Sequence, residues 1–185
     1  LKVVTQRYLE NKPQQTTILE VWHKTNPYHV EPIVLLVDLY SNTQQKSRAL
    51  TLVDKALAGH HSESSLLKMT KMYLLLDAQQ TAKSKAFYQL LINDGTFEFA
   101  DNALTQGIEG RIFLLEKKYS QAVIGLTASY ERYPTRKNLI FLVGAYQGNN
   151  ENDKAITALK AYLSDNESDH GIRTIVANFY LPEQP

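Results

Sequence analysis

Apolar residues recur with helical periodicity along most of the chain, in stretches separated by short polar turns. Residues 139–163 show the plan: an apolar run ends at Tyr146, the polar stretch GNNEN follows, and apolar residues resume at Ala155, Leu159 and Leu163. Spacings of three and four residues place such side chains on one face of a helix. This stretch therefore predicts two amphipathic helices joined by a polar turn.

An aromatic residue followed nine positions later by alanine marks the same plan at four places. The pairs are Tyr40 with Ala49, Tyr73 with Ala82, Phe113 with Ala122, and Tyr146 with Ala155. The aromatic residues are 33, 40 and 33 positions apart. A period of this length is typical of helical repeats, and a large residue facing a small one lets two helices approach closely. The pattern predicts an all-α fold of stacked helix pairs.

Prolines and capping residues agree with these boundaries. Pro27 precedes the first full pair and Pro134 follows the third, where a helix must already have ended. The serines of residues 62–65 and Asp101 or Asn102 stand where the next helices need an N-cap. Each predicted pair is therefore bounded at its ends as well as at its turn.

The pattern resembles the tetratricopeptide repeat family, whose 34-residue unit is a helix–turn–helix with large and small residues at fixed positions. Gly110 and Pro134 match two of its positions, besides the aromatic and alanine pairs. The predicted segments are a degenerate repeat over 1–29, repeats over 30–63, 63–96, 103–136 and 136–169, and a capping helix over 170–185. The resemblance implies one domain over 1–185, a right-handed α-solenoid.

Seven extra residues lengthen the interval between the second and third pairs. They lie in the segment 92–102, INDGTFEFADN, which contains Phe97 and Phe99. In one reading the two rings pack back onto the repeats. In the other, Phe97 and Phe99 contact a partner.

Composition narrows the class of protein. The chain has 185 residues, of which 43% are apolar and 21% charged, and its net charge is +1. This is a globular composition without a general attraction to nucleic acid or anionic membranes. No apolar run approaches the roughly 20 residues of a membrane span. The absence of cysteine excludes disulfides and thiolate metal sites. Because the chain begins with leucine, we expect it to be a piece of a longer protein.

The sequence contains no recognisable catalytic motif. It lacks the phosphate-loop, zinc-protease and nucleophile-elbow patterns, and Gly107 and Gly110 fall inside a predicted helix, where close packing explains Gly110. The adjacent His60 and His61 would need a distant third ligand to hold a metal. We therefore expect no enzyme activity, no cofactor, no metal and no nucleic-acid partner.

In the family, the first helices of the repeats line a concave groove that binds peptides. The resemblance carried onto this chain gives a mixed apolar and basic groove: Asp38, Lys68, Lys71, Arg111, Lys137 and Phe141. Its cations suggest an extended or helical peptide with acidic side chains or a free carboxylate. The alternative is that these charges are simply solvated on an exposed helix face.

The expected function is therefore a non-enzymatic scaffold for protein–protein interaction. The polar repeats look similar to bacterial envelope proteins that assemble secretion or pilus machines, and a cytoplasmic adaptor is the other setting. Two further alternatives are an accessory or regulatory domain of a larger enzyme and a direct glycan-binding module. The divergent amino-terminal segment is the expected place of contact in a homodimer.

Overall fold

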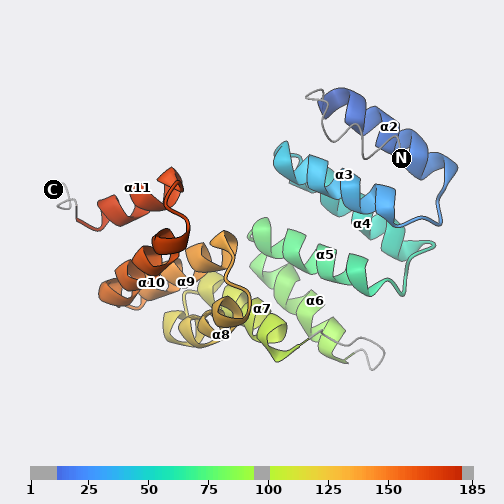
Figure 1. The fold of residues 1–185 in the computed structure, drawn as a ribbon. Helices are drawn as coiled ribbons and strands as arrows, with labels where there is room; N and C mark the ends of the chain where they lie inside the picture. The colour runs from blue at the N-terminus through green and yellow to red at the C-terminus, as the bar shows by residue number, and fades with distance from the viewer. Residues whose placement is uncertain (1–11, 94–100, 181–185) are drawn as a thin grey trace. The chain divides into compact units, whose positions relative to one another are not determined.

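All regular structure in the described part of the chain is α-helical. The computed structural model describes residues 12–93 and 101–180, and the regular elements in these ranges are ten helices (Figure 1). They are α2 (Lys12–Thr25), α3 (Glu31–Asn42), α4 (Lys46–Ala58), α5 (Ser65–Asp77), α6 (Thr81–Asn93), α7 (Asn102–Leu115), α8 (Tyr119–Arg132), α9 (Arg136–Gly148), α10 (Asn152–Asp165) and α11 (His170–Asn178). The prediction of an all-α fold is confirmed.

The chain divides into two compact units, Leu1–Glu98 and Phe99–Pro185. Within each unit a helix packs mainly on the helices next to it in the chain, from α2 to α6 and from α7 to α11. Packing on sequence neighbours is characteristic of helical solenoids. We call α3, α5, α7, α9 and α11 the first helices and α4, α6, α8 and α10 the second helices.

Side-chain caps begin four of the first helices. The hydroxyls of Ser64 and Thr135 and the carboxylates of Asp101 and Asp169 each accept a hydrogen bond from the backbone N–H three residues further on. Such a cap satisfies one of the N–H groups that the first helical turn leaves without a partner. The caps predicted within residues 62–65 and at Asp101 are confirmed.

The four helix pairs share one turn geometry. Each turn contains one residue with a positive φ between 54° and 60°: Gln44, Gln79, Lys117 and Asn150. The N–H of the following residue donates to the carbonyl five positions earlier, at distances from 2.7 to 3.0 Å. These acceptors are Tyr40, Leu75, Phe113 and Tyr146. This is the hydrogen bond that closes a Schellman motif, and it identifies the four acceptors as equivalent positions.

The second pair is therefore Leu75 with Ser84, and the prediction of Tyr73 with Ala82 is wrong. Ser84 follows Leu75 by the nine residues found in the other three pairs. Leu75 and Ser84 are 2% and 0% exposed, whereas Ala82 is exposed. Serine can take the place of alanine because its hydroxyl donates to the carbonyl of Gln80, 2.9 Å away and one turn earlier.

The core of the first unit is built from apolar residues of α3, α4 and α5. Ile33, Val53 and Leu67 are completely buried, and Leu19 and Trp22 of α2 pack against the same cluster. Burying one such aliphatic side chain stabilises the fold by about 1.5–3 kcal/mol. The core therefore holds α2 to the first helix pair.

Glycines bring α7 and α8 into backbone contact in the second unit. A Cβ atom at Gly125 would collide with the carbonyl oxygen of Gln106, and one at Gly110 would lie 2.9 Å from the backbone nitrogen of Leu126. Neither backbone neighbour can move without separating the two helices. Close packing explains Gly110, as the sequence predicted.

Gly125→Ala is expected to lower the free energy of unfolding by about 1–3 kcal/mol, the usual cost of overpacking. Gly144→Ala is the matched control, because a Cβ atom there would have no other atom within 4 Å. Alanine favours a helix over glycine by about 1 kcal/mol, so this control should be more stable than the wild type. Urea denaturation followed by circular dichroism measures both changes. Equal effects would contradict the proposed contact.

The corrected second pair predicts that residue 84, and not residue 82, must have a small side chain. Ser84→Leu is expected to lower the free energy of unfolding by about 1–3 kcal/mol, because a large side chain must enter a closed interface. Ala82→Leu should change it by less than about 0.5 kcal/mol, since residue 82 is exposed. Thermal melts of the two variants decide between the pairs: a larger loss with Ala82→Leu would restore the original assignment.

Candidate functional site

Metal-ligating side chains do not gather in the described part of the chain. Across residues 12–93 and 101–180, no three His, Cys, Asp or Glu side chains lie where they could hold an ion. The predicted histidine pair makes ordinary contacts: Nε2 of His61 lies 3.0 Å from the carbonyl oxygen of Pro27, and the His60 ring packs on Tyr28. None of the helices in these ranges is long and apolar enough to cross a membrane. The candidate sites are therefore helix surfaces.

In the first unit, one predicted groove residue is exposed and two are largely covered. Asp38 of α3 is exposed. The ammonium of Lys71 lies 2.7 Å from Oδ1 of Asp54 on α4 and 4.6 Å from the centre of the Phe87 ring on α6. The side chain of Lys68 is only 12% exposed, and its ammonium lies 3.6 Å from a carboxylate oxygen. Lys71 therefore belongs to the packing of α5 against the second helices.

The corrected register explains why Lys68 and Lys71 are covered. Two residues along a helix correspond to a rotation of about 200°, which moves a side chain to nearly the opposite face. In the corrected register, the positions of α5 that were expected to line the groove are occupied by other residues, among them Leu66 and Tyr73. Leu66 is 53% exposed, so the face of α5 that contains these positions is more apolar than the sequence predicted.

In the second unit, the structure brings Arg111 and Phe141 together. The guanidinium of Arg111 on α7 lies 4.1 Å from the centre of the Phe141 ring on α9. Only 6% of Arg111 is exposed. A guanidinium stacked on an aromatic ring is fixed in orientation as well as stabilised by the ring. The contact therefore makes a rigid platform from two neighbouring first helices.

A stripe of residues continues this platform along α9. Lys137 precedes Ile140 and Phe141 by three and four residues, and Gly144 follows them by four and three. Lys137 is exposed, 36% of Ile140 is exposed, and the space beside Gly144 is open for at least 4 Å. The completely and largely buried residues of α9 lie on its other sides. The stripe therefore faces outward.

Helix α11 carries an equivalent stripe. His170 and Arg173, both exposed, follow Lys137 and Ile140 by 33 residues, the period of the repeat. Sequence reasoning missed Arg173 because it gave the last helix only a capping role, although the 33-residue period was the signal that could have found it. We call Lys137, Ile140, Phe141 and Arg173 the basic face of the second unit; the buried Arg111 supports the Phe141 ring of this face.

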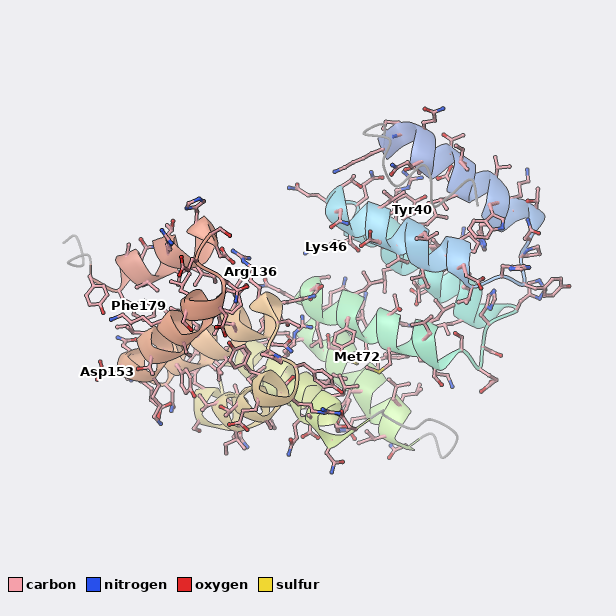
Figure 2. All side chains as sticks on the ribbon, in the orientation of Figure 1. Tyr40, Lys46, Met72, Arg136, Asp153 and Phe179 are labelled. Carbon is pink, nitrogen blue, oxygen red and sulfur yellow. The ribbon has the colours of Figure 1, made fainter. Side chains whose placement is uncertain are left out.

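An ion pair joins the beginnings of α9 and α11. Arg136 is the first residue of α9 (Figure 2). Its Nε lies 2.7 Å from Oδ2 of Asp169, the N-cap of α11. The hydrogen bond from Arg136 and the backbone N–H of Ile172 hold the pKa of Asp169 below its ordinary value. The pair fixes the spacing between the two stripes at one end.

Phe97 and Phe99, the predicted loop contacts, lie outside the described residues. Helix α6 extends to Asn93, and α7 begins at Asn102. Both readings of the segment 92–102 therefore stay predictions.

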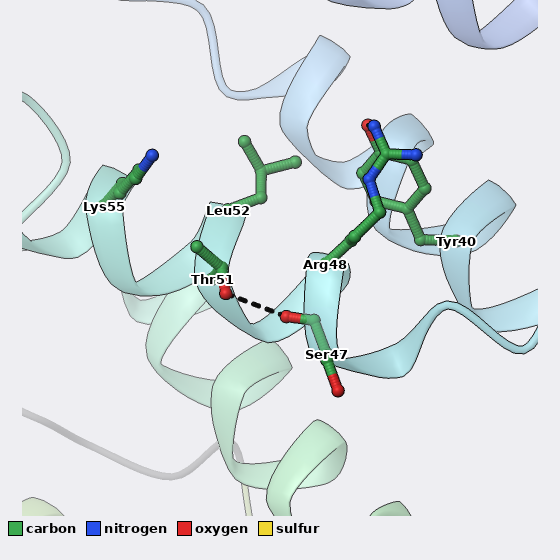
Figure 3. A pocket seen from close by; sticks show the side chains of 6 residues that line it. All are labelled: Tyr40, Ser47, Arg48, Thr51, Leu52 and Lys55. Carbon is green, nitrogen blue, oxygen red and sulfur yellow. Dashed lines mark hydrogen bonds between the residues drawn. The ribbon is translucent and has the colours of Figure 1, made fainter.

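Two hollows lie against second helices at equivalent places in the two units. One has a volume of about 320 Å³ and is lined by Tyr40, Ser47, Arg48, Thr51, Leu52 and Lys55 (Figure 3). The other has a volume of about 360 Å³ and is lined by Tyr146, Asp153, Lys154, Thr157, Ala158 and Ala161. Each residue of the second lining follows its counterpart in the first by 106 positions. We call them the Tyr40 hollow and the Tyr146 hollow.

His23 of α2 is partly buried against the first unit. Burial lowers the pKa of His23 below its ordinary value of 6.5, and the neighbouring His61 lowers it further. Nδ1 of His23 is buried without a hydrogen-bond partner in the described part of the chain. The folded first unit therefore favours the neutral form of His23.

Comparison with known proteins supports the fold. No protein-family profile matches the chain, and no curated protein matches its sequence. The structure of MamA from Desulfovibrio magneticus is 14% identical, with a TM-score of 0.63 over 91% of this chain and 93% of that one. A tetratricopeptide repeat protein from Parabacteroides merdae is 15% identical, with a TM-score of 0.63 over 97% and 70% of the two chains. The chain thus has a tetratricopeptide-like helical-repeat fold.

Acidification is expected to loosen α2 through His23. Below pH 6.5 the unfolded chain binds a proton that neutral His23 in the folded unit does not, so stability falls as the pH decreases through this value. Trp22 is the only tryptophan and packs on the same core, so its fluorescence reports the docking of α2. Melting temperatures recorded by this signal should fall less between pH 7.5 and 5.5 in His23→Gln than in the wild type. Parallel curves for the two proteins would contradict this role of His23.

Proposed function

We propose that the chain is a non-enzymatic interaction scaffold that binds an acidic segment of a partner protein on the basic face of the second unit. The observation that carries the proposal is the Phe141 ring, held in place by the buried Arg111, together with the exposed cations Lys137 on α9 and Arg173 on α11. The face offers apolar surface and two exposed cations together. An acidic side chain next to an apolar one is the ligand that fits both.

The expected energetics assign different roles to these residues. Partly exposed apolar side chains such as Ile140 and Phe141 supply anchoring area, and the cations select and steer the partner. The Phe141 ring is already held in place by the Arg111 guanidinium, so binding does not have to immobilise the ring. An exposed ion pair contributes at most about 1 kcal/mol. The partner segment should therefore carry more than one acidic residue.

A place in a bacterial envelope assembly or secretion system is part of this proposal. Its support is the polar character of the repeats, whose turns contain the stretches SNTQQK and GNNEN. The solved structures that resemble this chain share its helical-repeat architecture.

Reversing two charges of the basic face tests the proposal. The probe is a fluorescein-labelled 12-residue peptide of alternating glutamate and leucine, titrated by fluorescence anisotropy. Lys137→Glu with Arg173→Glu is expected to weaken binding at least tenfold, because two attractive contacts of up to about 1 kcal/mol each become repulsive. Higher salt should weaken wild-type binding as well.

The matched control reverses two other lysines of the same unit, Lys117 and Lys160, to glutamate. Lys117 lies in the turn between α7 and α8 and Lys160 on a second helix, so the net charge changes equally away from the basic face. The control should bind the peptide as the wild type does. If both double variants weaken binding alike, or if the wild type does not bind the peptide, the basic face is not the site.

A further inference from the structure

The Tyr40 hollow lies in the first unit, beside α4, and is separate from the basic face. Arg48 is held there by contacts with three residues, among them a hydrogen bond of 3.3 Å from Nη2 to the Tyr40 hydroxyl. Its guanidinium carbon lies 4.5 Å from the centre of the Tyr40 ring, Nη2 donates to Oε1 of Glu20 at 3.0 Å, and Nη1 donates to Oε1 of Gln45 at 2.7 Å. Nε donates no hydrogen bond within the described residues, so the fixed guanidinium keeps donor capacity for a ligand.

Lys55 supplies a second cation on the same side of α4. It follows Arg48 by seven residues, which is two helical turns or about 10 Å. Figure 3 shows Arg48, Leu52 and Lys55 projecting from one side of the helix. Lys55 is exposed and makes no ion pair within the described residues. The lining thus presents two cations with the apolar side chain of Leu52 between them.

We propose that the Tyr40 hollow binds an acidic helical segment of a partner protein, with two carboxylates two turns apart and an apolar residue between them. One carboxylate would meet Arg48 and the other Lys55, and the apolar residue would cover Leu52. Glu20 compensates part of the Arg48 charge, so the hollow keeps about one net positive charge for the ligand. The two carboxylates of the partner helix thus match the charge and the spacing of Arg48 and Lys55 on α4.

The Tyr146 hollow shows that the shape alone does not require these charges. It has a similar volume and the same aromatic wall, yet Asp153 stands in place of Ser47 and Ala161 in place of Lys55. Its one cation, Lys154, lies 2.7 Å from Oε1 of Glu151. A hollow at this place in the repeat therefore does not need a positively charged lining. Of the two hollows, only the Tyr40 hollow has a second cation in its lining, Lys55.

The test uses a labelled 15-residue alanine-based helical peptide with glutamate at positions 4 and 11 and leucine at positions 7 and 8. All titrations are made in the full chain carrying Lys137→Glu and Arg173→Glu, so that failure of the basic face cannot affect the result. Lys55→Ala is expected to weaken binding at least fivefold. Lys83→Ala, which removes an exposed lysine from the second helix α6, should leave it unchanged.

Two further arms decide the outcome. A peptide with glutamine in place of both glutamates should bind at least tenfold more weakly. Adding Asp153→Ser, Ala158→Leu and Ala161→Lys to the Lys55→Ala chain should restore binding by giving the Tyr146 hollow the same lining charges. Equal affinity of Lys55→Ala and Lys83→Ala, equal binding of the two peptides, or no recovery in the last variant would overturn the proposal.

Discussion

The turn inside each helix pair fixes the rest of the structure. In all four pairs, the N–H after the positive-φ residue donates to the carbonyl of the same repeat position, occupied by Tyr40, Leu75, Phe113 or Tyr146. This bond ends the first helix at a set distance from that large side chain. Nine residues later the second helix brings a small residue to the contact, and the two helices can then pack closely. Every pair therefore closes in the same way, although the turns differ in sequence.

The sequence was sufficient to locate three of these contacts, because tyrosine or phenylalanine opposite alanine differs clearly from its surroundings. The second pair could not be found in this way. Tyr73 with Ala82 and Leu75 with Ser84 have the same spacing, and the first looks more typical. What decides between them is that the hydroxyl of Ser84 is satisfied inside its own helix, which makes a buried serine as acceptable as alanine. Composition and periodicity do not contain that information.

A small error of register has a large effect on a predicted surface. The shift of two residues turned the expected face of α5 by about 200°, so Lys71 was assigned to a groove although its ammonium contacts Asp54 and Phe87. In the second unit the turns place Phe113 and Tyr146 at the predicted pair positions, and Arg111 and Phe141 are in contact. Core positions repeat and can be inferred from one another, whereas surface positions depend on the rotation of each helix.

Cations stacked on aromatic rings recur in several repeats, with the ring at the same position. A charge that recurs in this way has a structural role in the repeat, whereas a charge found in one repeat alone does not. Arg48 on Tyr40, Lys118 on Phe113 and Lys154 on Tyr146 all lie within 6 Å of the ring centre. Because the same contact appears in three repeats, stabilisation of the cation over the ring face explains it without a ligand. Lys55 has no counterpart in this set, since alanine stands at the equivalent position of α10. The repeat thus accounts for the position of Arg48, whose Nε still keeps a donor for a ligand, and Lys55 is the charge in the Tyr40 hollow that this structural role does not explain.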